Sequence, residues 1–424
     1  MNVLQNAAWV VVFAFCWAFV ALAQSSQSLT LDEAINEAIA SNLNLIAERY
    51  NLSVAEAKII TARLRPNPVL TVEGDQLPLL GTQFNSINMA GPPEYAVRTD
   101  FILERGGKRD DRIAVAENNK EVVRAQLENT IRLLVLDVQN AFVDVLQARD
   151  NLNLARENLD AFTRIVGINE TRVRSGDLSE VELLRTQLAQ LQFENSVRQA
   201  EVRLSTAQAK LRLLIGRKHD DPAFQAVGDL RKDMIPLNRE SLRQQAVQLR
   251  PDLQAVVHDQ ARSAAELRLQ IAQGKVDYTV GAEARRQQGV AGTGNSLGLF
   301  FSTNLPVFNR NQGEIERARQ EQQQLAARYR ALEASIDTDV DTAYAQYDIA
   351  RNTVERIEST MLNKARDVRQ ITEYSYRRGE ANFVEFLDAT RAYNETIQTY
   401  NEARAEYARS LYLIDSVAGK AATQ

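Results

Sequence analysis

The sequence predicts a mainly α-helical protein with a small β part, built as two tandem structural repeats. Long stretches carry apolar residues at three- and four-residue steps, which is typical of helices. Four short stretches alternate apolar and polar residues, which is typical of strands. One distinctive helix break occurs twice, about half the chain apart, and the length of 424 residues exceeds the usual size of one domain.

The composition indicates an ordered chain with no affinity for nucleic acid. Gly and Pro are scarce, at 18 and 9 residues, which favours helix over disorder. The 50 basic and 55 acidic residues leave a net charge of −5, so no basic surface is expected.

The N-terminus predicts a secretory signal covering residues 1–23. Residues 7–23 are apolar, end in Ala-Leu-Ala and lead into a polar segment. An uncleaved anchor is the alternative, because this apolar run is nearly long enough to span a bilayer. The single cysteine, Cys16, lies inside the signal, so the mature chain is expected to hold no disulfide and no cysteine metal site.

The repeat is clearest where "RSGDLSEVELLRTQ" (174–187) returns as "RRGEANFVEFLDATR" (377–391). Gly176 corresponds to Gly379, a shift of 203 positions, while Ile113 and Ile315 are 202 apart. We interpret such small drifts as loop insertions. The predicted organisation is a signal at 1–23, a first repeat at 24–216, a linker at 217–236, a second repeat at 237–419 and a short tail at 420–424.

Each half is expected to run helix, strand, strand, long helix, turn, helix. A helix over about 31–65 begins at Thr30, which forms a capping box with Glu33, and it stops before Pro66. Long helices over about 108–174 and 313–377 would each extend about 100 Å.

The repeated break predicts a tight turn between two helices. Gly176 and Gly379 end the long helices because glycine readily adopts positive φ. A capping box of Ser179 and Glu182 restarts the helix in the first repeat. The second repeat has a near match in Asn382, three residues before Glu385.

The strands are expected at 69–76, 96–103, 276–284 and 296–305, each with one apolar and one polar face. This pattern suits a transmembrane barrel with lipid outside and water inside, and a soluble sandwich is the alternative. Four strands cannot close a barrel and open edges are not tolerated in lipid, so three chains would share twelve strands. Segments 77–94 and 289–294 would be the loops between paired strands.

The chain resembles the TolC family of outer-membrane efflux channels. The stretch "YRRGEANFVEFLDAT" (376–390) is similar to the family's inner hairpin turn, and "NLPVFNRNQGEIERA" (304–318) to its strand-to-helix junction. The resemblance implies a homotrimer in the outer membrane of a Gram-negative bacterium. A twelve-stranded β-barrel would be continued by a long periplasmic α-helical barrel, which docks on a periplasmic adaptor and an inner-membrane RND-type pump. The stretch "LERGGKRDDRI" (103–113) resembles the cobalt–zinc–cadmium resistance branch, which implies export of heavy-metal cations.

We expect no catalytic site and no cofactor. The two histidines are interpreted as a solvated linker residue, His219, and a structural helix residue, His258, so no metal site is expected. The resemblance implies a cation-selecting ring of Glu385 and Asp388, three residues apart on one helix face. It also implies a gate latch and an adaptor contact at the turns. The latch candidates are Tyr376, Arg377, Arg378, Arg174 and Glu182, and the turn residues are Gly176, Ser179, Gly379 and Asn382.

One position departs from the family's pattern, because Ala381 stands where the family's latch places an arginine. Two alternatives remain at this point. The first is a TolC-like duct for drugs or for type I protein secretion. The second is a periplasmic coiled-coil adaptor or scaffold.

Overall fold

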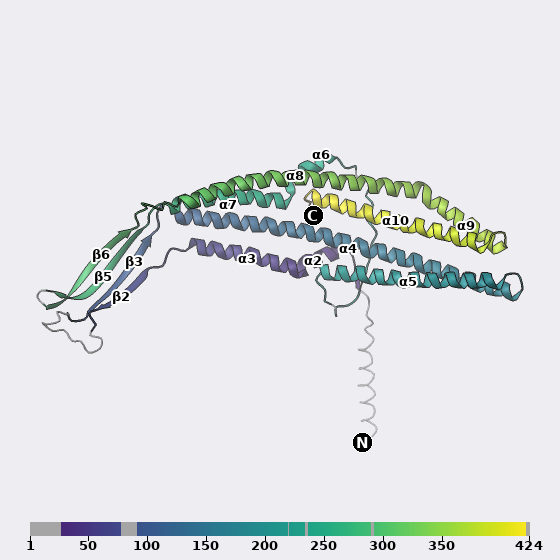
Figure 1. Ribbon diagram of the computed structural model, residues 1–424, viewed down its shortest axis with the longest axis horizontal. Helices are drawn as coiled ribbons and strands as arrows, with labels where there is room; N and C mark the ends of the chain where they lie inside the picture. Colours follow the sequence, from purple (N-terminus) through teal and green to yellow (C-terminus); the bar gives the residue numbers. More distant parts are fainter. Residues whose placement is uncertain (1–26, 78–90, 219, 234–235, 290–291, 421–424) are drawn as a thin grey trace, which may run out of the picture. The chain divides into compact units, whose positions relative to one another are not determined.

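A computed structural model of the chain describes residues 27–77, 91–218, 220–233, 236–289 and 292–420 (Figure 1). The expected signal, His219 and most of the 77–94 loop lie outside these ranges. The described chain is mainly helical with a small β part, as predicted. It forms two compact units, the first from the described parts of Met1–Ala47, Asn129–Arg250 and Ser335–Gln424, the second from Glu48–Glu128 and Pro251–Ala334. Each unit therefore contains segments of both sequence halves.

The first unit is built from helices and one small parallel sheet. The sheet pairs β1 (Gln27–Leu29) with β4 (Phe224–Ala226), so the predicted linker contributes a strand. Among the described residues, no helix combines the length and apolar character needed to cross a bilayer. The helices that lie wholly or partly in this unit are α2 (Leu31–Ser41), the start of α3 (Leu43–Arg63), α4 (Lys108–Arg174), α5 (Glu180–Leu214), α6 (Arg239–Leu249), α8 (Gln312–Arg356), α9 (Leu362–Arg378) and α10 (Phe383–Val417).

The main core of this unit joins both halves of the chain. Val138 and Phe142 of α4, Leu211 of α5 and Ala408 of α10 are buried together. Phe224 of β4 belongs to the same cluster. Since these residues recur at three- and four-residue steps, the helical periodicity seen in the sequence is what forms the core.

The first helix is broken, which differs from the continuous helix predicted over 31–65. The Thr30–Glu33 capping box is present, but the helix ends at Asn42, which is extended at ψ 120°, and α3 (Leu43–Arg63) follows. The Asn42 side chain accepts from the N–H of Leu45 and donates to the carbonyl of Leu214. The second repeat has the same break at Arg250, also at ψ 120°.

The two long helices differ from each other. The first is a single helix, α4, with the predicted bounds. The second is interrupted by the π-helical turn η2 (Ile357–Met361) between α8 and α9, where an uninterrupted helix was expected. The helical periodicity of either segment alone does not reveal this difference, because one extra residue leaves the apolar pattern on both sides nearly unchanged.

The second unit carries a four-stranded antiparallel sheet in the order β2-β3-β5-β6, together with α3, α7 (Pro251–Gln273) and the first parts of α4 and α8. Its strands are β2 (Val69–Asp75), β3 (Glu94–Leu103), β5 (Tyr278–Gly289) and β6 (Gly292–Thr303). The last two extend into the predicted 289–294 loop, and Gly289 pairs with Gly292. The loop is thus shorter than expected.

The predicted faces of the sheet are confirmed by its register. The row Val72, Val97, Ala284 and Leu297 lies across all four strands. Directly paired residues share a face, so the apolar side chains of the four strands collect on one side. They are largely exposed, and Leu299 is 83% accessible.

The opposite face of the sheet is polar and held by ion pairs. Arg285 of β5 contacts Glu283 on its own strand at 2.8 Å and reaches Glu73 of β2 at 2.7 Å. Arg98 and Asp100 of β3 form a further pair. This division into an apolar and a charged face suits a sheet with different media on its two sides.

The "GGKR" segment has a structural role at the start of α4. Lys108 is buried and its Nζ contacts Asp277 Oδ2 and the carbonyl of Lys275, both at 2.8 Å. Arg112 pairs with Glu104 at 2.8 Å. These contacts fix the strand-to-helix junction.

Candidate functional site

The turns of the two helical hairpins lie together at one end of the first unit, here called the tip. The first hairpin is α4–α5 and the second is α9–α10. Gly176 and Gly379 have φ of 83° and 79°, as predicted for residues that end a helix in the left-handed conformation. A Cβ built on Gly379 would lie 3.4 Å from Nη2 of Arg172, so the second turn rests against the first hairpin.

Both turns restart a helix with a side-chain cap, but the full capping box is in the second hairpin. Asn382 accepts from the N–H of Glu385, and the Glu385 carboxylate accepts from the N–H of Asn382. Ser179 accepts from the N–H of Glu182 at 3.4 Å. The near match thus forms the more complete box, which leaves Glu385 with a local capping role.

Aromatic side chains join the two hairpins at the tip. Tyr376 of α9 is buried and stacks on Phe386 of α10, with ring centroids 5.2 Å apart. Phe386 also stacks on Phe162 of α4, at 5.6 Å. Ile165, Ala189 and Phe383 complete this small core. The predicted latch residue Tyr376 is therefore an integral part of the contact between hairpins.

A buried polar contact lies beside the aromatic core. Asn169 of α4 donates from Nδ2 to the hydroxyl oxygen of Tyr376 at 2.7 Å and to the hydroxyl of Thr186 at 3.3 Å. Thr186 in turn donates to carbonyls of its own helix. Oδ1 of Asn169 is buried with no hydrogen-bond partner among the described residues, which costs about 1–3 kcal/mol. The contact therefore links the hairpins and is only partly satisfied.

The environment of Tyr376 favours its neutral hydroxyl. Burial, first, and the nearby negative charge of Glu182 both raise the pKa of Tyr376, against the opposing effect of Asn169 and Arg172. The hydroxyl therefore remains protonated near neutral pH.

The predicted arginines contact their own hairpins in this chain. Arg377 pairs with Glu373 at 2.6 Å, and Arg378 lies over the ring of Tyr374 at 4.8 Å. Arg174 donates to a carbonyl of α4. It is Arg172, which the sequence analysis did not single out, that lies against the opposite turn.

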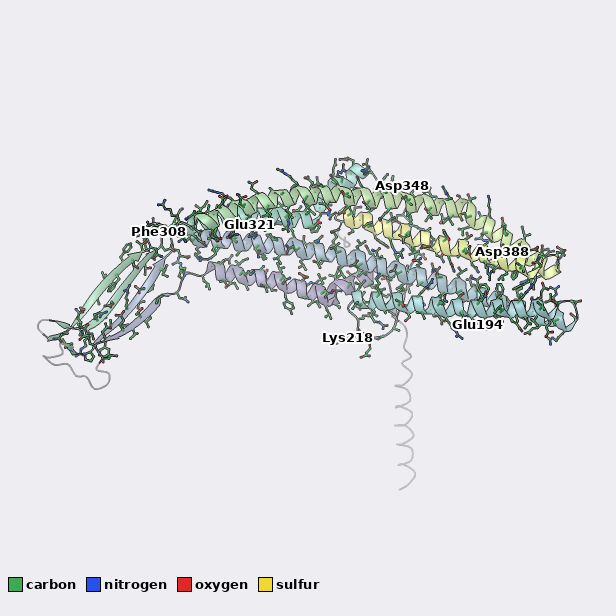
Figure 2. The ribbon with its side chains drawn as sticks, viewed as in Figure 1. Glu194, Lys218, Phe308, Glu321, Asp348 and Asp388 are labelled. Carbon is green, nitrogen blue, oxygen red and sulfur yellow. The ribbon has the colours of Figure 1, made fainter. Side chains whose placement is uncertain are left out.

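The two predicted ring residues are exposed near the start of α10 (Figure 2 labels Asp388). Within the described ranges, no group of three or more His, Cys, Asp or Glu residues is arranged to hold a metal ion. The tip thus offers solvent-facing carboxylates on one chain.

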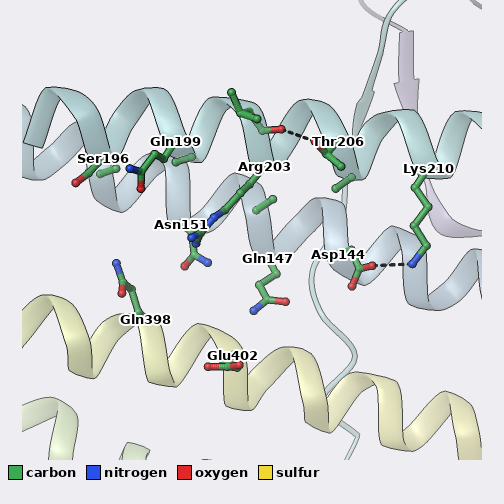
Figure 3. A pocket seen from close by; sticks show the side chains of 15 residues that line it. Asp144, Gln147, Asn151, Ser196, Gln199, Arg203, Thr206, Lys210, Gln398 and Glu402 are labelled. Atoms are coloured by element: carbon green, nitrogen blue, oxygen red, sulfur yellow. Dashed lines mark hydrogen bonds and ion pairs between the residues drawn. The ribbon is translucent and has the colours of Figure 1, made fainter.

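A groove of about 730 Å³ lies between α4, α5 and α10, away from the tip turns (Figure 3). Asp144 and Lys210 form an ion pair at its wall. Glu402 of α10 faces the same space across from Gln147. Its lining is mixed in charge and rich in amides, so it indicates no particular ligand.

Exposed apolar residues continue beyond the sheet at the strand-to-helix junction. Leu305, Val307 and Phe308 follow β6 and are 77%, 63% and 92% accessible. Figure 2 labels Phe308. Together with the apolar face of the sheet they form a large exposed apolar surface. A surface of this kind marks a contact with a membrane or with another protein.

The family model for outer membrane efflux proteins matches this chain twice, at residues 34–217 and 242–420. The two matches cover most of the sequence. The chain belongs to the outer membrane efflux protein family. It is accordingly an outer-membrane efflux protein, a transport duct rather than an enzyme.

Two curated relatives agree with this family. The cobalt-zinc-cadmium resistance protein CzcC of Cupriavidus metallidurans is 26% identical over 400 residues, which cover 94% of this chain and 91% of the relative. The outer membrane efflux protein BepC of Brucella suis is 21% identical and covers 78% of this chain and 72% of its own.

Solved structures show the same fold. The structure of CusC, a protein that forms a transmembrane channel, aligns with a TM-score of 0.75. The alignment covers 92% of both chains at 18% identity. The open state of the Neisseria gonorrhoeae MtrE outer membrane channel aligns at 0.72 over 92% of this chain and 89% of the other, at 17% identity. The fold predicted through the family resemblance is therefore confirmed.

Several contact residues at the tip were missed from the sequence, and Asn169 and Arg172 show why. Asn169 occupies an apolar step of α4, four residues after Ile165 and seven after Phe162. A polar residue at such a step marks a buried hydrogen bond. Arg172 carried no signal, because its partner is a turn 207 residues away (172 to 379).

Proposed function

We propose that three copies of this chain form a channel through the outer membrane, with the strands in the lipid and the helices in the periplasm. The single observation that carries this is the four-stranded sheet with an exposed apolar face, a charged opposite face and the edge strands β2 and β6. Such a sheet needs further strands at both edges to reside in lipid. Four strands from each of three chains would give the twelve expected.

The helices of the first unit support a ring of identical chains. Near the tip, α10 and α4 lie between α9 and α5 (Figure 1). The outer helix α5 has an exposed apolar stripe at three- and four-residue steps: Val181, Leu184, Leu188 and Leu191, each 55–59% accessible. The other outer helix, α9, has a second: Val368, Ile371 and Tyr374. A contact between these two different stripes would be head-to-tail, the type of contact that forms a ring when the rotation between neighbouring chains closes.

Charge favours the pairing of these stripes between chains. Residues 180–194 of α5 hold three glutamates and one arginine. Helix α9 holds five basic and two acidic residues. Because opposite charges flank the two apolar stripes, α5 of one copy would attract α9 of the next.

The relatives support a proposal for the cargo and the partners. The similarity to the cobalt-zinc-cadmium resistance protein supports heavy-metal cations as cargo, delivered by an inner-membrane RND-type pump through a periplasmic adaptor. The exposed turns at Gly176 and Gly379, with their caps Ser179 and Asn382, are the proposed adaptor contact. The chain provides a passage that favours cations, and the choice among metal ions is left to the pump.

Assembly is tested by native mass measurement in detergent with matched variants. Leu188→Lys places a positive charge opposite the basic α9 and is expected to shift the trimer toward monomer. Leu188→Glu at the same position is expected to retain more trimer. A parent chain that is a stable monomer, or equal effects of the two variants, would contradict the proposed assembly.

The cargo is tested in a host lacking its own channel. Supplying this chain with its adaptor and pump should restore tolerance to zinc, cobalt and cadmium. Restored tolerance to antibiotics, or restored protein secretion, without any change in metal tolerance would favour the drug or type I secretion duct instead.

A further inference from the structure

The two repeats differ by one residue within their long helices. Arg149 of α4 corresponds to Arg351 of α8, a shift of 202, whereas Ile168 corresponds to Ile371, a shift of 203. The second repeat therefore needs 20 steps (351 to 371) where the first needs 19 (149 to 168). The phase before this segment is shared, because Val138 and its counterpart 202 positions later are both buried.

The extra residue lies in a helix, not in a loop as we expected for such drifts. Between α8 and α9 the chain stays helical, and η2 (Ile357–Met361) is the one described interruption. The N–H of Leu362 bonds to the carbonyl of Ile357, five residues back. A π turn of this kind accommodates one residue more than an α-helical turn while the flanking helices keep their phase.

The π turn coincides with a bend. Figure 1 shows α9 leaving the direction of α8, while α4 runs as one helix from Lys108 to Arg174. Sharp bends in helices occur characteristically at π turns and prolines. Tyr376, Gly379 and Glu385, which form the second half of the tip, all follow this bend.

One side-chain contact fastens the bend to α10. The hydroxyl of Tyr400 donates to Oε1 of Glu358, within the π turn, at 2.7 Å. Burial and this carboxylate raise the pKa of Tyr400, so the donor proton is present near neutral pH. Ile357, beside it, is buried. The turn is thus anchored by the burial of Ile357 and by the hydrogen bond from Tyr400 to Glu358.

We propose that η2 is a hinge, created by a one-residue insertion in the second repeat, and that the Tyr400–Glu358 contact holds it in the bent form. The hinge lets the α9–α10 hairpin change direction while α4–α5 stays straight. The two hairpins at the tip therefore differ in their freedom to move. Any effect of the hinge on passage through the tip rests on the proposed channel function. The insertion and the bend themselves do not rest on it.

The insertion is tested by matched deletions in the full chain. Deleting Ser359 removes the residue that the π turn accommodates, so the flanking helices should keep their phase and the cooperative thermal transition should be retained. Deleting Glu157, which is 202 positions earlier in the uninterrupted α4, rotates everything after it by about 100°. That deletion should abolish the transition. If both deletions abolished the thermal transition equally, the proposal that the π turn accommodates an inserted residue would be overturned.

The bend is tested by spin-label distances, which the chain permits because its one cysteine lies in the predicted signal. Labels at Asp348→Cys in α8 and Gln370→Cys in α9 are 22 residues apart, about 33 Å along a straight helix. Labelled chains are diluted with unlabelled ones so that distances within one chain dominate. Deleting Ser359 leaves 21 residues between the labels, about 32 Å along a straight helix, and should narrow the distance distribution. Tyr400→Phe should broaden it. Distributions of equal width in all three chains would overturn the hinge.

Channel recordings then separate this inference from the proposed function. If the parent conducts, the Ser359 deletion should change its single-channel conductance, and an unchanged conductance would overturn the effect of the hinge on the tip. If the parent does not conduct, the proposed channel fails while the distance measurement still decides the hinge.

Discussion

At the scale of single residues, the contact between the hairpins can be tested by removing one atom, the hydroxyl oxygen of Tyr376. Tyr376→Phe keeps the stack on Phe386 but removes the acceptor that Asn169 uses. We expect a loss of about 1 kcal/mol in the free energy of unfolding. We also expect a larger open probability in planar-bilayer recording, because the hairpins lose their polar link.

Tyr393→Phe is the control for this change, since it removes a hydroxyl from the same hairpin outside the tip core. Its ring lies under the guanidinium of Arg369, a contact that phenylalanine preserves. Equal open probabilities in the two variants and the parent would remove Tyr376 from the gate and leave it a packing residue.

The residues of the tip were predictable to different degrees. Tyr376 was reached only through the family resemblance, because a tyrosine on a helix has no distinctive spacing of its own. Asn169 was within reach of pattern analysis, as a polar residue on an apolar step. Arg172 shows the limit: it lies against the turn at Gly379, and how two hairpins about 200 residues apart are turned toward each other cannot be read from the spacing on one helix.

At the scale of elements, the turn of the second hairpin should be sensitive to any side chain at its glycine. Gly379→Ala places a Cβ at φ 79°, which costs about 1–2 kcal/mol. Gly167→Ala in α4, where an added Cβ meets nothing within 4 Å, should instead stabilise the helix by about 0.5–1 kcal/mol. Denaturant unfolding measures both, and shifts of the same sign would contradict the proposed strain.

Elements with strong local signals were predicted well. The bounds of α4 are those expected, because strand and glycine signals precede it and Gly176 ends it. The break at Asn42 was missed because the residues on both sides favour helix, and packing of Asn42 against Leu214 decides it. The π turn was missed for a related reason: its single extra residue leaves the apolar pattern nearly unchanged on either side.

At the scale of the whole molecule, the exposed apolar face of the sheet should decide membrane insertion. Leu299→Arg puts a charge on that face, at a cost of about 2–4 kcal/mol near the middle of a bilayer. Ser296→Arg puts the same charge on the polar face of the same strand, where water is expected. Membrane fractionation should find less of the first variant in the outer membrane than of the second. Equal amounts of the two variants in the outer membrane would show that this face of the sheet does not contact lipid.

The last prediction concerns the carboxylates that three copies would bring together. Glu385→Gln with Asp388→Asn removes two charges from each chain. Glutamine still completes a capping box with Asn382, and Asp388 is exposed, so the helix start should stay intact. Six carboxylates around one axis repel one another, and a bound cation relieves that repulsion. The double variant should therefore keep the trimer but lose cation preference and sensitivity to divalent block in single-channel recording. If it conducts and blocks like the parent, Glu385 is only a cap, Asp388 belongs to a solvated face, and selection occurs at another part of the passage.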